Sequence, residues 1–289
     1  MAEYAGIPHA RDVRGDLWPR EAIDRTHPPF SEPLACGRCG VPVRARRSHT
    51  RQGKRGRVID VAACYYLHSG GEHEPDCPYD FERRARGIRQ ESRGTIEHRD
   101  GHWRLLLPNP TETTGESRAS ALARAAAPRR RLQITPSRSR LAPAINSAGK
   151  IARLLAEFDD HPDAAEQFRA HLGNIVLTWR EFCYGPRDYQ RLAETLTTGQ
   201  PSHPIAVHGR TFALADRGGS HALRAHGRAR LDDTWIPVVL RSRRADLLAP
   251  AVDRCWLAYG SWQHWTGQRG YRELQLWITR PWQITTWNS

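Results

Sequence analysis

The chain has 289 residues, of which 44 are Lys or Arg and 31 are Asp or Glu, for a formal net charge of +13 at pH 7. With 39% hydrophobic residues it can bury the cores of about two domains, which argues against a wholly disordered protein. No apolar run approaches the roughly 18 residues that span a bilayer, and the first residues lack the layout of a signal peptide, so we expect a soluble cytoplasmic protein.

The basic residues are almost all arginine, because Lys54 and Lys150 are the two lysines of the chain. Arginine stays charged, forks onto phosphates and stacks on bases, whereas lysine is the usual charge-neutralising residue of nuclease sites. The composition therefore favours a protein that binds nucleic acid over one that cuts it. The alternative is a basic protein that its charge merely keeps in solution.

The first 33 residues are rich in Pro, Arg and acids without sustained periodicity, and predict an N-terminal arm that packs on something else. A compact Cys/His segment, expected to be a zinc-binding domain, runs from 34 to 108. It begins with Cys36-Gly-Arg-Cys39-Gly, a Cys-x2-Cys followed by Gly. This is the form of a zinc knuckle, in which a tight turn directs two thiolates at one metal ion.

The second half of the predicted zinc site lies between Cys64 and Cys77, where the sequence offers four more ligands and a tetrahedral zinc needs two. We predict His73 and Cys77, because the spacing is His-x3-Cys and the residues that follow read as the start of a helix. Cys64 and His68 are the reserves. A knuckle on a hairpin plus ligands at a helix start is a treble-clef-like arrangement, and four protein ligands make the zinc structural. A disulfide framework or unrelated buried thiols are the alternatives.

The stretch from Cys36 to Cys77 resembles the Cys-rich N-terminal region of the competence protein CoiA family and related bacterial proteins of mobile elements. In that family a Cys-x2-Cys precedes a basic hairpin, a strand that ends near a His-aromatic pair, and a further Cys. Here Cys64-Tyr65 stands where that pair would be. The family also carries a nuclease core of the Asp…Glu-x-Lys type after the zinc region. Neither lysine of this chain follows an acid at that spacing on a plausible strand, so the resemblance does not extend to the nuclease core.

A basic cluster lies between the two predicted ligand pairs, with seven cations in fourteen residues and no acid. On the tip of a two-stranded ribbon it would form a phosphate-binding finger, and the alternative is a solvated loop without a partner. Its members are Arg44, Arg46, Arg47, Arg51, Lys54, Arg55 and Arg57.

Residues 109–142 turn to Thr, Ser, Ala, Pro and Arg, and predict a basic flexible linker. A helical region is expected at 143–200, from three apolar stripes at helical spacing. They begin at Ile151, at Ala165 and at Tyr189, and the second continues through Phe168 and Leu172. The stripes would pack a small helical core, form a dimer interface or dock a larger complex.

From 201 to 289 the period at which apolar residues recur changes from 3.6 to 2 residues, which predicts strands. Their order is β-β-β-α-β-β, with strands at 205–214, 221–231, 235–241, 255–262 and 271–278 and a helical insert at 244–253. This order resembles the OB-fold, a five-stranded barrel that commonly binds single-stranded nucleic acid or oligosaccharide. SH3-like barrels and some sandwiches give similar strings of short strands.

Within the OB-like interpretation, alternation places four residues of strands two and three on the usual binding face. They are Arg224, Arg228, Trp235 and Arg241. The loop after strand four would add Trp262, Trp265 and Arg269. Arginines hold phosphates and tryptophans stack bases, although an aromatic residue is more often part of a core.

The sequence thus predicts an α+β multidomain protein: a treble-clef or zinc-ribbon-like domain, a short helical middle region and a C-terminal OB-like five-stranded barrel. The expected function is binding of nucleic acid, with single-stranded DNA as the favoured ligand and structural Zn²⁺ as cofactor. The setting would be an accessory subunit of a bacterial DNA transaction such as mobile-element transfer, recombination or defence.

Two alternatives stay open. The first is a zinc-associated nuclease, but the acid and His groups at His161, Asp163 and Glu97-His98-Arg99-Asp100 have no recognisable catalytic spacing, so we expect no enzyme. The second is a protein-interaction adaptor that docks a larger complex through its Trp-rich C-terminus.

Overall fold

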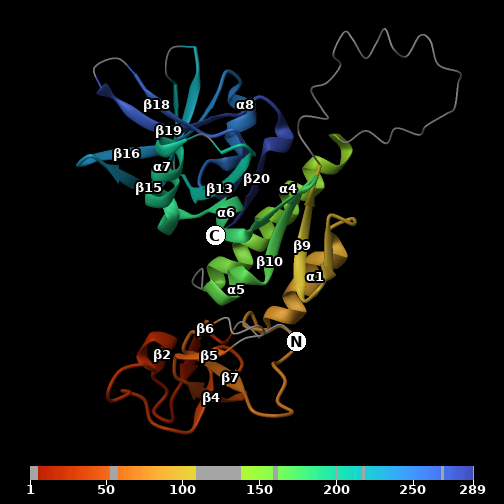
Figure 1. Ribbon diagram of the computed structural model, residues 1–289, viewed down its shortest axis with the longest axis vertical. Helices are drawn as coiled ribbons and strands as arrows, with labels where there is room; N and C mark the ends of the chain where they lie inside the picture. The colour runs from red at the N-terminus through yellow and green to blue at the C-terminus, as the bar shows by residue number, and fades with distance from the viewer. Residues whose placement is uncertain are drawn as a thin grey trace, which may run out of the picture. The chain divides into compact units, whose positions relative to one another are not determined.

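The computed structural model describes residues 6–52, 58–108, 138–158, 162–199, 201–211, 213–216, 219–267 and 270–288. The chain is mixed α+β, as predicted, with most of its regular structure in sheets and several short helices (Figure 1). It divides into two compact units. Unit 1 comprises Met1–Ile88, Asp100–His102 and Arg153–Phe168, and unit 2 comprises Arg89–Arg99, Trp103–Ala152 and Arg169–Ser289.

Unit 1 contains an antiparallel five-stranded sheet of order β2-β1-β3-β4-β7. Its strands are β1 (His9–Arg11), β2 (Leu17–Pro19), β3 (Leu34–Cys36), β4 (Pro42–Arg46) and β7 (Cys64–Leu67). A separate two-stranded ribbon consists of β5 (His49–Gln52) and β6 (Val58–Val61). The helices of this part are η1 (Arg20–Ala22), α1 (Phe81–Glu91) and α5 (Pro162–Glu166). The first 33 residues therefore supply two strands of the sheet that carries the Cys-x2-Cys motif.

The loop from β1 to β2 is organised by the buried carboxylate of Asp12. It accepts hydrogen bonds from the backbone N–H of Arg14 at 2.9 Å and Asp16 at 3.1 Å, and from the indole Nε1 of Trp18 at 3.3 Å. Burial raises the pKa of Asp12, but the hydrogen bonds from Arg14, Trp18 and the backbone outweigh it and lower that pKa to about 2. One acidic side chain thus orders a segment that has no apolar periodicity.

Unit 2 contains a four-stranded sheet of order β11-β10-β9-β8. Its strands are β8 (Ile96–Arg99), β9 (His102–Leu107), β10 (Phe168–Leu172) and β11 (Ile175–Thr178). The predicted second helical stripe is confirmed only at its start, where Ala165 lies on α5, and is wrong beyond it, because Phe168 and Leu172 lie on β10, which turns at Gly173 into β11. The segment alternates buried and partly exposed residues, and the two-residue turn at Gly173, with φ of +60°, is a hairpin signal that outweighs the helical spacing.

The other two helical predictions are confirmed. The stripe from Ile151 belongs to α4 (Arg138–Glu157), which begins inside the predicted linker and contains Pro143. The stripe from Tyr189 belongs to α7 (Tyr189–Thr198), whose apolar face is buried. Two short helices, α6 (Trp179–Phe182) and the 3-10 helix η3 (Pro186–Asp188), lie between them in the chain. Residues 109–137 of the predicted linker lie outside the described residues.

The C-terminal part of unit 2 forms two sheets, of order β12-β13-β17-β20 and β14-β15-β16-β19-β18. The first consists of β12 (Cys183–Tyr184), β13 (Ile205–Arg210), β17 (Cys255–Gly260) and β20 (Ile284–Trp287). The second consists of β14 (Leu214–Asp216), β15 (His221–Leu231), β16 (Thr234–Ser242), β19 (Arg272–Trp277) and β18 (Gln263–Thr266). Short helices join them: α8 (Ala245–Leu248), η4 (Ala249–Ala251) and η6 (Pro281–Gln283).

The predicted β-β-β-α-β-β order holds, with differences at the ends of strands. The residues predicted as a loop after strand four include the strand β18, and β20 has no counterpart in the prediction. Between Arg224 and Arg228 the β15–β16 register shifts, and Gly227 has a φ of +96°, which is typical of a β-bulge. Described strands form two sheets here, and the structure shows no closed barrel in that part.

The core of the C-terminal part gathers apolar side chains from α7, α8 and both sheets, among them Tyr189, Trp256 and Trp262. Tyr189 also donates a hydrogen bond from its hydroxyl to the backbone oxygen of His208 at 2.9 Å. None of the described helices is both long enough and apolar enough to cross a membrane.

Candidate functional site

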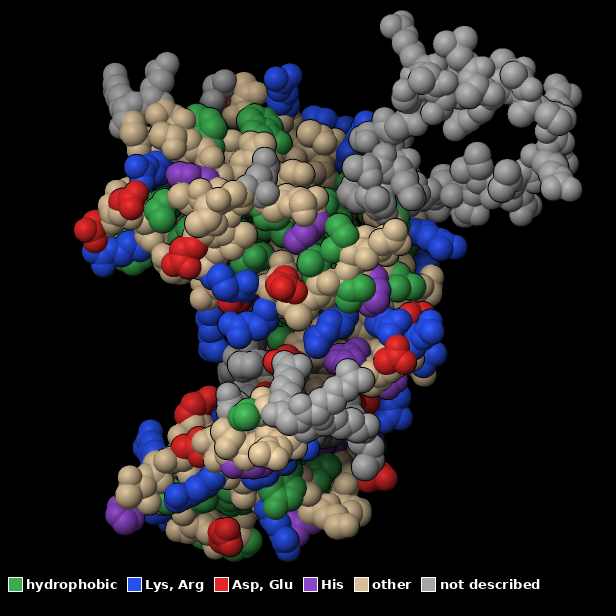
Figure 2. Space-filling view, in the orientation of Figure 1, with side chains coloured by type: hydrophobic (Ala, Val, Ile, Leu, Met, Phe, Trp, Pro, Cys, Tyr) green, Lys and Arg blue, Asp and Glu red, His purple; other side chains and the backbone are tan. Residues whose placement is uncertain are grey.

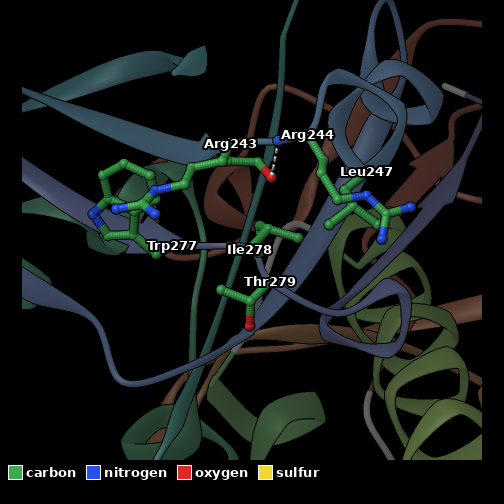
Figure 3. Close-up of a pocket in the computed structure, with 7 residues that line it drawn as sticks. Arg243, Arg244, Leu247, Trp277, Ile278 and Thr279 are labelled. Atoms are coloured by element: carbon green, nitrogen blue, oxygen red, sulfur yellow. Dashed lines mark hydrogen bonds between the residues drawn. The ribbon is translucent and has the colours of Figure 1, made fainter. Parts of the chain in front are cut away.

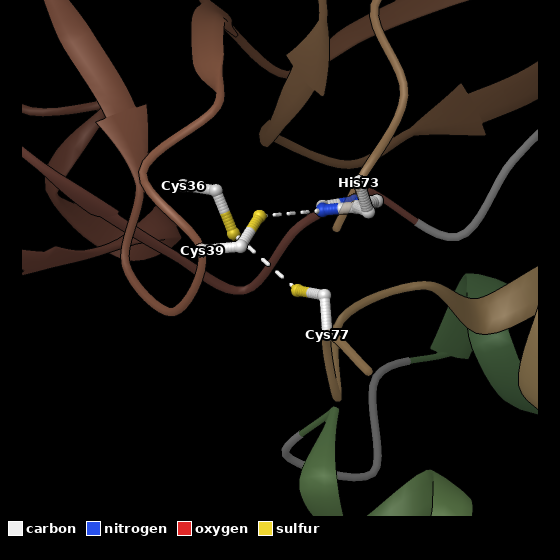
Figure 4. A group of neighbouring side chains, drawn as sticks. All are labelled: Cys36, Cys39, His73 and Cys77. Carbon is white, nitrogen blue, oxygen red and sulfur yellow. Dashed lines mark hydrogen bonds between the residues drawn. The ribbon is translucent and has the colours of Figure 1, made fainter. Parts of the chain in front are cut away.

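The four predicted zinc ligands converge in unit 1 (Figure 4). Cys36 Sγ lies 3.9 Å from Cys77 Sγ, and Cys39 Sγ lies 3.4 Å from His73 Nδ1. All four ligand atoms lie within 4.8 Å of one another. A tetrahedral ion with Zn–S bonds of about 2.3 Å needs sulfur atoms roughly 3.8 Å apart, so the observed spacing suits one metal ion.

The knuckle turn follows β3 directly. Gly40 donates its backbone N–H to the Cys36 oxygen at 3.0 Å, and its φ of +74° lies in the left-handed region that favours glycine. Gly37 donates to the His9 oxygen at 3.1 Å, and a Cβ on it would lie 2.6 Å from the Leu17 side chain. The backbone path that aims the two thiols therefore favours glycine at position 40, and a side chain at Gly37 would crowd Leu17 and the His9 oxygen.

The second pair of ligands is placed by the turns before α1. Cys77 donates its backbone N–H to the Glu74 oxygen, and Asp80 donates its own to the Cys77 oxygen. Asp80 also accepts from the Arg83 backbone N–H at 3.1 Å, as a helix N-cap does. The predicted helix start after the second ligand pair is thus confirmed.

Thiols that bind a metal ion must lose their protons, and the surroundings of these groups act on that loss in different directions. Burial raises the pKa of the Cys36 thiol, and burial raises that of Cys77 to about 12. For Cys39 burial also acts upward, but hydrogen bonds from the backbone N–H groups of Val41 and Glu74 outweigh it and lower its pKa. Burial lowers the pKa of His73, which keeps the imidazole neutral, as a metal ligand must be.

The residues present fit a metal ion on two further grounds. Three thiols and one imidazole form a donor set that soft or borderline metals prefer over calcium or magnesium. The ring nitrogen of His73 that faces the thiols is Nδ1, at 3.4 Å from Cys39 Sγ, as expected for two ligands of one ion. The reserve ligand Cys64 lies outside the cluster, because its Sγ accepts a hydrogen bond from Arg46 Nη2 at 3.3 Å, and His68 lies outside it as well.

The basic cluster between the ligand pairs is placed in part. The β5–β6 ribbon exists as predicted, and all four residues of β5, including Arg51, are exposed. Arg44 is exposed on β4 opposite Tyr66 of β7, and Arg47 is exposed with Nη2 donating to the Arg25 oxygen at 3.4 Å. Lys54, Arg55 and Arg57 lie outside the described residues. Arg46 is directed at the buried thiol of Cys64, so it does not present its guanidinium to a phosphate.

A second set of residues shares one face of the five-stranded sheet β14-β15-β16-β19-β18. Directly opposed residues of paired strands lie on the same face, so the register assigns the members. We call this the outer sheet face, and its exposed or partly exposed members include Arg224, Arg228, Arg230, Trp235, Arg241, Trp265 and Trp277. By the same register the face also carries the buried side chains Ala222, Val239, Glu273 and Gln275. The opposite face carries the buried side chains Leu223, Ile236, Val238, Leu240, Leu274 and Leu276.

Two tryptophans of the outer sheet face are exposed beside arginines. Trp235 is 59% exposed, and the guanidinium carbon of Arg230 lies 6.0 Å from its ring centroid. Trp265 is 39% exposed, and the guanidinium carbon of Arg241 lies 5.9 Å from its ring centroid. Such pairs gain a cation–π attraction and hold the rings in place. Basic side chains, with acidic ones between them, spread over the visible surface (Figure 2).

Arg241 is held by the carboxylate of Glu273, which is fully buried. The pair is bidentate, with Arg241 Nε donating to Oε1 at 2.5 Å and Nη2 donating to Oε2 at 2.9 Å. The hydrogen bond to Glu273 raises the pKa of Arg241. Arg224 is also engaged, since its Nη2 donates to the hydroxyl of Tyr271 at 2.9 Å. The side chain of Arg228 is exposed and makes no hydrogen bond or ion pair with another described residue.

The prediction that Trp262 stacks on bases is wrong. Trp262 is 1% exposed and belongs to the core of the C-terminal sheets, because β17 ends at Gly260 and the chain turns inward before β18. Arg269 lies outside the described residues. Trp277 and Arg230 were not among the predicted binding residues, although the alternation along the strands that indicated Trp235 also places both on the outer sheet face.

The acid and His group proposed for a nuclease does not converge on a site in the described part. Glu97 forms an ion pair with Arg104 at 3.5 Å, and the ring of His98 lies against that of Trp103 at 4.5 Å between centroids. Asp163 is placed, whereas His161 lies outside the described residues. Among the described residues, the side chains that cluster closely enough to bind a metal ion are those of Cys36, Cys39, His73 and Cys77.

Comparison with known proteins gives little similarity. No family model matches the chain, and a search of curated proteins finds no match. Among solved structures, one described as "OBody AM3L09 bound to hen egg-white lysozyme" is 19% identical, with 33% of this chain and 91% of that chain covered and a TM-score of 0.22. A putative aspartyl-tRNA synthetase from Leishmania major Friedlin is 8% identical, with 36% of this chain and 20% of that chain covered and a TM-score of 0.24. At these scores neither likeness bears on fold or function.

Proposed function

We propose that the protein binds single-stranded nucleic acid, with DNA as its ligand, as a non-catalytic accessory subunit of a bacterial DNA transaction. The observation that carries the proposal is the outer sheet face, where exposed Trp235 and Trp265 each lie beside an arginine on one sheet surface. Base stacking on exposed rings, with guanidinium groups beside them, is the usual means of sequence-tolerant single-strand binding.

The strand pairing supports an OB-like arrangement of this region. β16 and β19 are parallel neighbours, whereas β15–β16, β13–β17 and β18–β19 are antiparallel. β14 follows β13 and pairs with β15, and β18 follows β17 and pairs with β19. If β13 and β14 are taken as one bent first strand and β17 and β18 as one bent fourth strand, then β15, β16 and β19 are the second, third and fifth strands. Neighbouring strands then follow the order first, second, third, fifth, fourth and back to the first, which is OB-like. The outer sheet face includes residues of the second and third strands.

Structural zinc is the metal we propose for the Cys36, Cys39, His73 and Cys77 cluster. When bound, Zn²⁺ supplies folding free energy to unit 1 and holds the knuckle and the start of α1 in a treble-clef-like arrangement. Four protein ligands complete its coordination, so the proposal gives it no part in a reaction. In unit 1, the ribbon β5–β6 and the exposed Arg44, beside Tyr66, present cations and a ring that can contact a polyanion.

The test is equilibrium binding of fluorescent oligo-dT and of a duplex of the same length, at two salt concentrations and with and without magnesium. The wild-type protein should retain oligo-dT, more weakly at high salt because bound counterions are released. Degradation in magnesium would support a nuclease, and no retention at either salt concentration would overturn the proposal in favour of an adaptor.

Variants assign the binding to the outer sheet face. Trp235→Ala and Trp265→Ala should each weaken oligo-dT binding by about 5- to 150-fold, the effect of losing one stacked base, and the Phe variants should retain most of the affinity. Arg254→Ala is the matched control, since Arg254 is exposed and lies outside this face. Equal binding by both Trp→Ala variants and the wild type would contradict the assignment.

A further inference from the structure

A cavity of about 390 Å³ lies where the end of β16, the end of β19 and α8 come together (Figure 3). Its volume falls within the range of roughly 300 to 1,000 Å³ that is usual for small-molecule sites. The residues that matter for its chemistry are Arg243, Arg244, Leu247, Trp277, Ile278 and Thr279.

The lining combines an apolar floor with an aromatic wall. Leu247 and Ile278 are buried, and the Trp277 indole is 38% exposed. Figure 3 shows the side chain of Arg243 extending toward Trp277. A flat apolar ligand could therefore lie against the indole and cover the two aliphatic side chains.

The two arginines at the cavity differ in how they are engaged. Arg244 is committed to Asp246, with Nε donating to Oδ1 at 3.1 Å and Nη2 donating to Oδ2 at 2.5 Å. Arg243 is exposed and makes no hydrogen bond or ion pair with any described residue. The cavity thus offers one uncommitted guanidinium beside an aromatic face, which suits a ligand with a ring and an anionic group.

The cavity continues the outer sheet face. Trp277 directly opposes Arg241 in the β16–β19 register, and Arg241 contacts Trp265 on its other side. The backbone N–H of Ile278 donates to the Arg241 oxygen at 2.7 Å, which fixes the cavity floor to the same strand. A single strand that stacks on Trp265 and passes Arg241 arrives at Trp277.

We propose that this cavity receives one nucleotide of the bound strand, with its base on the Trp277 indole above Leu247 and Ile278 and its phosphate at Arg243. The inference rests on the proposed function and adds a cause of strand preference to it. A base must leave its stack and its partner to enter the cavity, and an unpaired base does so at much lower cost than a paired one. The cavity therefore selects single strands over duplexes.

The test compares variants of two exposed side chains on oligo-dT and duplex. Trp277→Ala should weaken oligo-dT binding by about 5-fold or more, and Trp277→Phe should restore most of it, because stacking survives in a smaller ring. Arg243→Ala should weaken binding and make the slope of log K against log salt shallower by about 0.7, as for one lost phosphate contact on a single strand. Duplex binding should not change, and Arg254→Ala should behave as wild type.

The outcomes separate the inference from the proposed function. If the wild type binds no strand, both are overturned. If Trp265→Ala weakens binding while the Trp277 and Arg243 variants bind like the wild type, the cavity assignment alone is overturned. Isothermal titration with dTMP distinguishes the source of the nucleotide: dTMP that competes with oligo-dT supports the inference, and dTMP that binds at the cavity without competing shows a site for a free nucleotide and overturns it.

Discussion

Trp262 and Trp265 lie three residues apart, yet the structure predicts opposite consequences for their loss. Trp262 is buried among the core residues of the C-terminal sheets, and its indole Nε1 finds no hydrogen-bond partner among the described residues. Trp265 is 39% exposed and touches Arg241 and the edge of the Tyr271 ring. Alanine at each position therefore tests burial against ligand contact within one short segment.

Trp262→Ala should destabilise the protein by about 3 to 5 kcal/mol, since it removes a large buried side chain and leaves a cavity. For a unit of this size that corresponds to a fall in melting temperature of roughly 6 to 20 °C. Trp265→Ala should change stability by less than about 1 kcal/mol, because the ring is partly in solvent already. It should weaken oligo-dT binding by about 1 to 3 kcal/mol.

Thermal unfolding followed by circular dichroism measures the first effect, and fluorescence anisotropy with labelled oligo-dT measures the second. Trp262→Phe is the control for burial: it keeps most of the apolar volume and removes an unpartnered N–H, so it should cost much less than alanine. Equal losses of stability from the two alanine variants would refute the assignment of Trp262 to the core and of Trp265 to the surface.

Three further predictions concern metal and charge. Elemental analysis should find one zinc per chain, and Cys39→Ser or chelation should lower both the metal content and the melting temperature, because metal binding supplies folding free energy. Burial lowers the pKa of His208 to about 4, so the folded state keeps the ring neutral while the unfolded chain takes up a proton below about pH 6.5. Stability from this group is complete above pH 6.5 and falls by about 3 kcal/mol on going to pH 4, a loss that urea denaturation should show in the wild type and not in His208→Gln. Glu273→Ala should cost about 3 to 5 kcal/mol by leaving Arg241 without its carboxylate, whereas replacing both residues with Leu or Met should cost far less in the same denaturation assay.

Local spacing made the metal cluster predictable from the sequence. A Cys-x2-Cys and a His-x3-Cys each place two metal ligands close together in the chain. The glycines on either side of the Cys-x2-Cys turn indicate its backbone conformation. The choice of His73 over Cys64 also held, because Cys64 begins the strand β7 and accepts a hydrogen bond from Arg46, whereas His73 lies in the turns before α1. What joins the two pairs is long-range packing, which spacing alone does not give.

The errors have a common physical origin in competing periodicities and in tertiary burial. Phe168 and Leu172 stand at helical spacing and at strand spacing at once, and the pairing of β10 with β9 and β11 decides between them. Trp262 lies just after a strand, a position at which the sequence predicts a loop, but its large apolar ring is buried in the core. The first strands escape prediction because Asp12, rather than an apolar stripe, organises them.

The net charge of +13 overstates how much charge the binding surfaces offer to a ligand, because several of the predicted arginines already interact with other side chains of the protein. Arg46 is engaged with Cys64, Arg224 with Tyr271 and Arg241 with Glu273. The side chains of Arg44 and Arg228 remain exposed without a hydrogen bond or ion pair to any described residue. A committed arginine such as Arg241 still steadies an aromatic ring, but it adds little to counterion release. The outer sheet face is therefore built more for stacking than for phosphate neutralisation, and stacking requires bases that are not already paired.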